Sequence, residues 1–303
     1  MLRFVTLLWF TIGFAATAQA CDMHTSARAS VVADYAEQGL DCLSGPTPGY
    51  RFDDIMERAF VAKINQERTS RGLTPLIIRD EMRPAARFHS LDMGVNRFFG
   101  HRSPTGKTHA ARVAAFDRTL LPKSSAENVA QLEMQCRDGA WQSISCADMP
   151  EQANDPMASA VKELHRQLMQ SAGHRKNILA PETTHIALGV ARTEFGVYVT
   201  QVFVQPAGFL NEPLPLRLKA GHQVKTSATA PGWTIKRFAL MQNNMHDDMR
   251  GGLIPAGIVG DRGLSVRGER SDKPTRKNGR LMQSYEFIYL NGPAFTVQPS
   301  TGS

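Results

Sequence analysis

The segment His185–Val204 constrains the fold more than any other part of the chain. In its first half Ile186, Leu188 and Val190 alternate with small residues, as in a strand. Residues 197–204 are apolar on nearly both faces of a second strand. Strands that are apolar on both sides must be covered on both sides. Helices stacked over each face of a mainly antiparallel sheet provide that cover, so the segment predicts a three-layer α/β/α sandwich of the α+β class.

Three predicted helices can supply the outer layers of this sandwich. Asp53 and Asp54 begin a helix whose apolar residues recur at near-helical spacing, and Gly72 ends it. A second helix follows Asp80, and a third runs over about residues 156–169. Both carry apolar residues along one face, as helices that cover a sheet must.

A change of pattern after residue 210 indicates a second domain. Pro213 and Pro215 mark a linker. Short apolar segments then alternate with Gly, Pro, Asn and Asp, which predicts a small β-rich domain. The expected strands are residues 223–229, 233–241, 252–259 and 283–290. Asp261–Arg280 is crowded with charges, Gly and Ser, so we expect a long loop or a mobile hairpin there.

The first twenty residues predict an export signal. Arg3 precedes an apolar run, Phe4–Ala16, and the small residues Ala18–Ala20 form a cleavage site. We therefore expect a mature protein that begins near Cys21 and is secreted or periplasmic. A lipoprotein acylated at Cys21 is the alternative. The predicted organisation is a signal peptide over 1–20, an N-terminal extension over 21–50, the sandwich domain over 51–210 and the β-rich domain over 211–303.

Four cysteines in an exported chain predict two disulfides. Proximity in the sequence favours Cys21 with Cys42 and Cys136 with Cys146. The second bridge would close a short loop that carries Trp141. That tryptophan is either an exposed contact site or a residue that packs back onto the domain.

The basic excess of the chain is concentrated in its C-terminal third. The net charge is +7, and residues 211–303 contain thirteen Lys and Arg against seven Asp and Glu. Without the signal peptide, the rest of the chain has twenty-one of each sign. The excess is either a solvated surface or a means of attraction to an anionic component of the cell envelope. We expect no nucleic-acid partner.

Three short motifs in the predicted sandwich each supply one side chain that can bind a metal. A Gly-His-Arg-Ser-Pro segment contains His101, Ala-Glu-Asn-Val-Ala contains Glu127, and Gly-His-Arg-Lys-Asn contains His174. Two imidazoles and a carboxylate form the smallest set that holds a divalent ion and leaves one coordination position open.

In their order and setting, these motifs resemble the CAP superfamily of cysteine-rich secretory proteins, antigen 5 and pathogenesis-related proteins, and above all its short bacterial members. The resemblance runs from about Arg51 to Gly208, and roughly half of the chain lies outside it. Further segments that carry it are Ile64–Arg68, Gly72–Leu76, Ala85–Ser90 and Tyr198–Phe203.

The resemblance implies a central cleft lined by two histidines and two acids. Matching by motif gives His101, Glu127 and His174, but the fourth position falls on Ser171, which is not an acid. The resemblance therefore implies a ligand-binding cleft with three of the four groups, and with Asn128 and Ser171 beside them.

Two interpretations of the three groups remain open. They would bind zinc or another divalent metal together, or Glu127 would accept hydrogen bonds from His101 and His174 without any metal. The other histidines, His89 and His109 among them, lie outside the motifs and are expected to be packed or solvated side chains.

We predict an exported binding protein whose cleft holds a metal or small ligand and whose basic domain attaches to an anionic envelope component. The resemblance adds a lipid or sterol in an apolar groove as a further ligand. A metal-dependent hydrolase that uses the same cleft is one alternative, and a structural envelope protein is another. Since no nucleophile elbow or oxyanion-hole signature is present, the sequence favours binding over catalysis.

Overall fold

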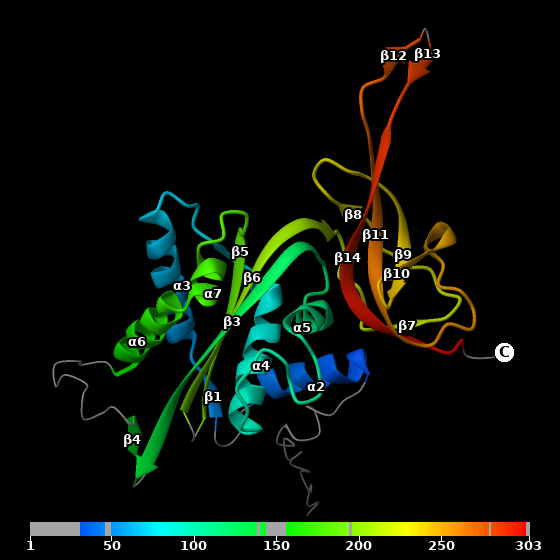
Figure 1. The fold of residues 1–303 in the computed structure, drawn as a ribbon. Coiled ribbons are helices and arrows are strands. Elements are labelled where there is room, and N and C mark those ends of the chain that lie inside the picture. The colour runs from blue at the N-terminus through cyan, green and yellow to red at the C-terminus, as the bar shows by residue number, and fades with distance from the viewer. Residues whose placement is uncertain are drawn as a thin grey trace, which may run out of the picture.

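The structure is a computed structural model that describes residues 31–45, 50–137, 140–143, 156–193, 196–278 and 280–300. It contains a helix-covered sheet and, beside it, a second sheet that ends in a projecting hairpin (Figure 1). The predicted signal peptide, Cys21 and Cys146 lie outside the described residues. Among the described residues no helix is long and apolar enough to cross a membrane.

The larger sheet has seven strands in the order β1-β5-β6-β3-β4, with β2 and β8 paired to β5 and β6. All neighbours are antiparallel except β2 and β5. The strands are β1 (Tyr50–Phe52), β2 (Ile77–Ile78), β3 (Leu120–Arg137), β4 (Ala140–Ser143), β5 (His185–Thr193), β6 (Gly196–Leu210) and β8 (Ala228–Thr229). The two strands predicted within residues 185–204 are confirmed as β5 and β6.

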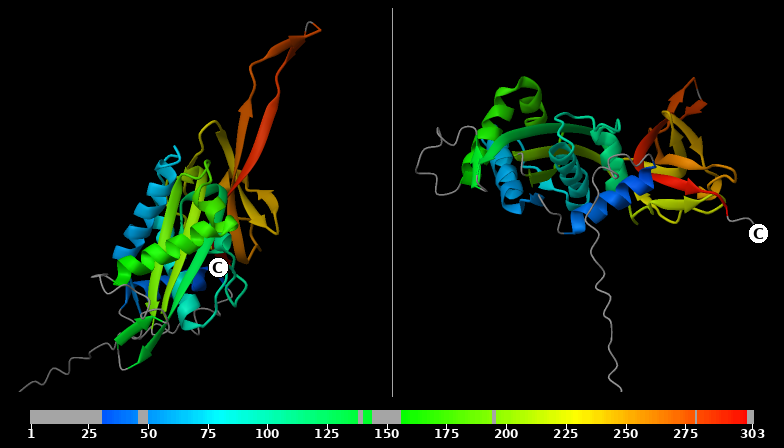
Figure 2. Two further views of the ribbon diagram at one scale, coloured as in Figure 1. Left: turned by 60° about the vertical axis from the view of Figure 1, so that its left-hand side comes forward. Right: turned by 90° about the horizontal axis from the view of Figure 1, so that it is seen from below.

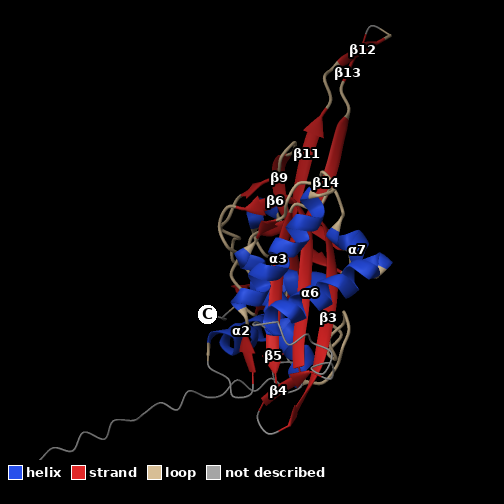
Figure 3. Cartoon of the chain, turned by 90° about the vertical axis from the view of Figure 1, so that its left-hand side faces the viewer, coloured by secondary structure: helices blue, strands red, loops and turns tan. Residues whose placement is uncertain are grey.

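Helices cover both faces of this sheet, which confirms the three-layer sandwich (Figure 2). One core lies under α3 (Asp54–Thr69) and α6 (Pro156–Gln170), with α7 (Ala172–Ile178) following α6. The other lies under α2 (Val32–Ser44), α4 (Arg83–Val95) and α5 (His109–Phe116). Successive residues of β5 enter opposite cores, as the pleat requires: Ile186 and Leu188 pack on one side and Ala187 on the other. Figure 3 shows α3 and α6 lying across the strands.

The predicted helices are present. Asp53 caps α3 by accepting the Met56 amide at 3.0 Å, and a 3₁₀ turn, η1 (Asp80–Met82), leads into α4. The third predicted helix is α6. The sequence did not predict α2, α5 or β3, and β3 is the strand that carries Glu127.

A second sheet of five strands has the order β10-β9-β11-β14-β7 and its own apolar core. Its strands are β7 (Arg217–Lys219), β9 (Thr234–Gln242), β10 (Met245–Asp248), β11 (Gly260–Ser271) and β14 (Tyr285–Gln298). Beyond β11 and β14 the chain continues into a separate two-stranded hairpin of β12 (Thr275–Lys277) and β13 (Arg280–Met282).

One expectation for this part of the chain is right only in part, and another is wrong. Of the segment Asp261–Arg280, predicted as a long loop or a mobile hairpin, the first half is strand β11, whose Leu264 and Val266 enter the core, and the rest belongs to the hairpin of β12 and β13. The strand predicted over 252–259 is instead a 3₁₀ turn, η2 (Arg250–Gly252), followed by turns. Gly252 and Gly257 have φ angles of 74° and 87° there, far from the extended values of regular strand residues.

The other two predicted segments agree in part or in full. Residues 233–241 correspond to β9, and residues 283–290 lie largely within β14. Of residues 223–229, only the last two form a strand, and they pair with the larger sheet; Gln223 makes an isolated bridge to Leu253.

The N-terminal helix α2 connects the two sheets. The backbone amides of Val32 and Ala33 donate to the side chains of Asp261 and Thr296, at 3.1 Å in the latter case. Cys42, at the other end of α2, is buried and disulfide-bonded, and Cys21 and Cys146 lie outside the described residues. The pairing with Cys21, and the bridge between Cys136 and Cys146, therefore stay predictions.

Candidate functional site

The site is built around the carboxylate of Glu127, which β3 places in the interior with 1% of its side chain exposed. One oxygen, Oε2, accepts a hydrogen bond from Arg112 Nη2 at 2.6 Å. The other, Oε1, accepts from His101 Nδ1 at 3.0 Å. An ionised carboxylate only accepts, so His101 donates from Nδ1, and in the neutral ring Nε2 is then the unprotonated nitrogen. The His101 side chain is 54% exposed, so this nitrogen faces the surface.

Arg112 is the counter-charge of Glu127 and is as deeply buried, with 1% of its side chain exposed. Besides the carboxylate, its guanidinium donates to the carbonyl oxygens of Lys107 at 2.9 Å and His101 at 3.1 Å. Arg112 therefore fixes the loop between His101 and α5 as well as the charge of Glu127. The sequence analysis missed it because the short helix α5 was not predicted.

His89 on α4 lies in the interior next to Glu127, and the sequence analysis did not predict it as part of the site. Its side chain is fully buried, and Nε2 lies 4.0 Å from Glu127 Oε1 while donating to the Gly100 carbonyl at 2.9 Å. Burial, reinforced by the charge of Arg112, lowers the pKa of His89 to about 3. His89 is thus a neutral group beneath the ion pair. Its Nδ1 has no hydrogen-bond partner among the described residues.

The charges around Glu127 keep it ionised. Burial alone would raise the pKa of Glu127, but the hydrogen bond from His101 and the charge of Arg112 outweigh burial and hold the pKa below its ordinary value. The centre of the site is therefore a buried, paired carboxylate at neutral pH.

His174, at the start of α7, lies beside His101, with ring centroids 6.4 Å apart. Partial burial and the proximity of His101 lower the pKa of His174, so it is neutral at pH 7. No hydrogen bond between His174 and Glu127 occurs in the described structure. The structure thus brings His174 next to His101 but does not bond it to the carboxylate.

The two remaining predicted residues differ in role. Asn128 is fully buried and anchors α7: its Nδ2 donates to the His174 carbonyl at 3.2 Å, and its Oδ1 accepts from Asn177 at 2.9 Å. Ser171 precedes α7, is half-buried and makes no side-chain hydrogen bond to the amides of that helix. Asn128 therefore positions His174, while Ser171 lies at the edge of the group.

The three predicted metal ligands do not fit a three-ligand zinc site in this arrangement. No group of three His, Cys, Asp or Glu side chains within the described ranges is placed to hold one ion. Both oxygens of Glu127 already accept hydrogen bonds, and the Arg112 cation lies where a second cation would be repelled. His101 and His174 remain as two neighbouring imidazoles at the surface.

Comparison with known proteins assigns most of the sandwich to one family. The profile of the Cysteine-rich secretory protein family, CAP, matches residues 61–205. The "Uncharacterized protein YkwD" of Bacillus subtilis (strain 168) is 30% identical over 185 residues, which cover 61% of this chain and 58% of that protein. The chain therefore spans little more than half the length of this relative.

Two solved structures resemble the chain more distantly. An outer surface protein from Borrelia burgdorferi is 15% identical, with a TM-score of 0.38, and the match covers 52% of this chain and 98% of that one. An extracellular protein containing a SCP domain from Bacillus anthracis str. Ames is 21% identical, with a TM-score of 0.35, over 56% of this chain and 43% of that one.

Replacing Glu127 with Gln tests the buried ion pair. Because this change leaves the Arg112 charge buried without its partner, we expect the free energy of unfolding at pH 7 to fall by about 3 kcal/mol. The folded pKa of Glu127 is lowered, so its contribution is present above the unfolded pKa of about 4.3 and is lost as the pH falls through the folded value. Urea unfolding from pH 7 to pH 3 should show the two proteins converging.

The control for this measurement is Glu212→Gln, at an exposed position. It should change stability by less than about 0.5 kcal/mol. A Glu127→Gln protein as stable as wild type at pH 7 would contradict the role of the pair.

Proposed function

Residues 61–205 of this chain belong to the CAP family, and we propose that they form the ligand-binding domain of an exported protein. The orientation of His101 is the observation that carries this proposal. Glu127 accepts the Nδ1 proton of His101, and the exposed Nε2 is thereby fixed as a hydrogen-bond acceptor or metal ligand beside His174. Two neighbouring imidazoles, one of them oriented by a buried ion pair, suit recognition of a small polar ligand through a hydroxyl or amide group.

Binding is better supported than hydrolysis. Ser103, the serine nearest His101 in the sequence, is 3% exposed, and its hydroxyl accepts the Lys107 amide at 3.0 Å and contacts Thr105. It stabilises the loop and is not presented to a substrate. No other nucleophile is paired with His101 in the described part of the chain, so the arrangement lacks the nucleophile and base of a covalent hydrolase.

Zinc titration distinguishes the two interpretations of the histidines. We expect weak binding that depends on His101 and His174, because only two imidazoles are free to coordinate an ion and its other positions hold water. His101→Ala or His174→Ala should abolish the calorimetric signal. His222→Ala, at an exposed histidine of the second sheet's domain, should leave it unchanged.

Affinity in the nanomolar range would contradict this expectation. It would mean that Glu127 leaves Arg112 to become a third ligand, as in a structural or catalytic zinc site. Equal binding by wild type and both histidine variants would show that the site holds no zinc.

Export is proposed from the first twenty residues. A positively charged start, an apolar run and a small-residue site precede the domain, so we expect cleavage after Ala20. Intact mass measurement of the protein from the envelope and medium of its native cells tests this. A mass that includes residues 1–20, or a diacylglycerol on Cys21, would contradict the proposed processing.

We also propose that the second domain attaches the protein to an anionic envelope surface through a projecting hairpin arm, residues 270–287. The arm comprises β12, β13 and the adjoining ends of β11 and β14, and it extends beyond the rest of the molecule (Figures 1 and 2). Every residue of the arm whose exposure is described is exposed. A projecting arm can meet an extended surface without a clash with the two domains.

The composition of the arm supports an anionic lipid surface as its partner. The arm contains two carboxylates, Asp272 and Glu286, and five cations, which are Arg270, Lys273, Arg276, Lys277 and Arg280. Four apolar side chains of the arm are more than half exposed: Leu281, Met282, Tyr285 and Phe287. Cations that approach anionic headgroups and apolar side chains that enter the interface are the two contributions that hold a peripheral segment on a membrane.

Vesicle sedimentation tests this attachment. Replacing Arg276, Lys277 and Arg280 together with Gln should weaken binding to vesicles of phosphatidylglycerol and phosphatidylcholine by at least about tenfold, since each cation near the surface contributes about 1 kcal/mol. Lys225, Lys236 and Arg250, which are exposed outside the arm, provide a control variant of equal net charge when replaced with Gln. The proposed role of the arm would be contradicted if both variants bound the vesicles equally weakly. It would also be contradicted if wild type bound pure phosphatidylcholine as tightly as the mixed vesicles.

A further inference from the structure

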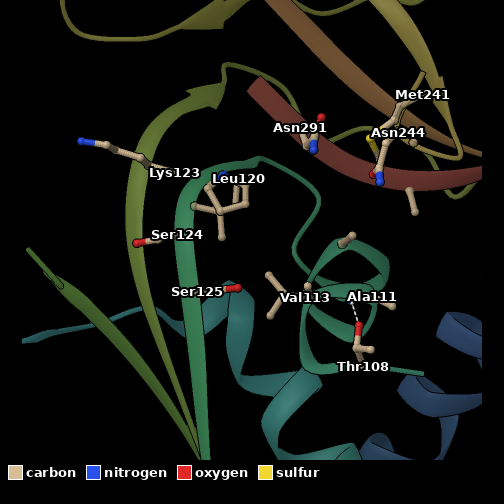
Figure 4. Close-up of a pocket in the computed structure, with 16 residues that line it drawn as sticks. Thr108, Ala111, Val113, Leu120, Lys123, Ser124, Ser125, Met241, Asn244 and Asn291 are labelled. Atoms are coloured by element: carbon tan, nitrogen blue, oxygen red, sulfur yellow. Dashed lines mark hydrogen bonds between the residues drawn. The ribbon is translucent and has the colours of Figure 1, made fainter. Parts of the chain in front are cut away.

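A cavity of about 630 Å³ lies where the two domains meet, between α5 and β3 on one side and β11, β14 and the turn after β9 on the other (Figure 4). It is separate from the side chains described above. This volume is within the range of sites for small organic molecules, about 300–1,000 Å³. Neither domain alone forms the cavity, because each provides only one wall.

The walls are close together because small residues line them. Ala110, Ala111 and Ala114 form the α5 side, and Gly263 and Gly292 lie on the opposite side. A Cβ atom at Gly292 would come within 2.8 Å of Leu121 Cδ2 and 3.3 Å of the Leu264 carbonyl oxygen, so a larger residue there would require Leu121 to shift. The absence of a side chain at Gly292 therefore allows the close packing of β14 against Leu121.

The lining is mainly apolar and has no carboxylate. Val113, Leu120 and Met241 contribute the larger apolar side chains. Lys123 is the one charged residue of the lining, and its side chain points away from the cavity in Figure 4. A charged ligand would lose its hydration here without gaining a partner, so the lining favours an uncharged one.

Polar groups converge on the cavity from both walls. The side chains of Asn244 and Asn291 come from the second domain, and neither makes a hydrogen bond with another described residue (Figure 4). Ser125 faces them from β3, with its hydroxyl 3.1 Å from His109 Nε2. Two free amides opposite a hydroxyl are suited to a ligand that carries an amide or hydroxyl group.

We propose that this interdomain cavity binds an uncharged, mainly apolar small molecule that bears an amide or hydroxyl group. Its apolar body packs between the alanines of α5 and Met241, and its polar group meets Asn244 and Asn291. Such a site gives the second domain a role in ligand binding in addition to attachment. The inference does not depend on the His101 site, because no residue is shared between the two.

Fluorescence titration with N-phenyl-1-naphthylamine, an uncharged aromatic amine, tests the cavity in the full mature protein. We expect saturable binding of one probe per protein. Ala111→Phe fills the cavity from the α5 wall, and Asn291→Phe fills it from the β14 wall. Each variant should therefore bind the probe at least tenfold more weakly than wild type. Ala256→Phe, at an exposed alanine away from the cavity, should bind the probe as wild type does.

The two substitutions lie on opposite walls, so the test can still be read if one of the variants does not fold. Thermal unfolding identifies which variants remain folded. The site is supported if wild type and Ala256→Phe bind the probe and the folded Ala111→Phe and Asn291→Phe variants do not. No probe binding by wild type, or equal binding by all folded variants, overturns it. Zinc binding by the same variants should match wild type, which separates this site from the histidine pair.

Discussion

The ion pair of Arg112 and Glu127 is the interaction on which the site depends. Both side chains are almost completely buried, and a buried pair stabilises only when its remaining donors and acceptors are bonded. The two terminal nitrogens of Arg112 meet this requirement by donating to two carbonyl oxygens of the loop that precedes α5, while its Nε has no partner among the described residues. The loop is therefore held by the same guanidinium that neutralises the carboxylate. The orientation of His101 follows, because the second carboxylate oxygen accepts its ring proton.

The elements whose buried residues are apolar could be predicted from the sequence, and those whose buried residues are polar could not. Strands β5 and β6 were evident because their residues are apolar on both faces, and this requires cover by helices on both sides. Strand β3 pairs with β6 over most of its length, yet it contains the buried Glu127 and Asn128. In a sequence such residues resemble a surface segment, since the partners that satisfy them lie on other elements. Arg112 and His89 were missed for the same reason, although both lie within 4.0 Å of Glu127.

The second domain shows a related limit on prediction. Strand β11 is central in its sheet, but only one face of that sheet is covered by the core. Its outward residues are charged, and together with Gly and Ser they gave the composition of a loop. Alternation with a period of two is present at Leu264 and Val266, but the residues two positions before and after them, Arg262 and Gly268, are not apolar side chains. A Cβ at Gly263 would lie 2.6 Å from Met241 Cε, so a larger residue there would require the Met241 side chain to move.

The contact between the two domains argues against a C-terminal third that serves only as a tether. A domain that served only as a tether would need a flexible connection and little shared surface. Here Leu121 of β3 lies in the core of the second sheet, and Arg118 donates to the Ala294 carbonyl of β14 at 2.6 Å. The sandwich and the second sheet are thus joined by buried apolar and polar contacts next to the interdomain cavity. These contacts join β14 directly to β3, and β3 is the strand that carries Glu127.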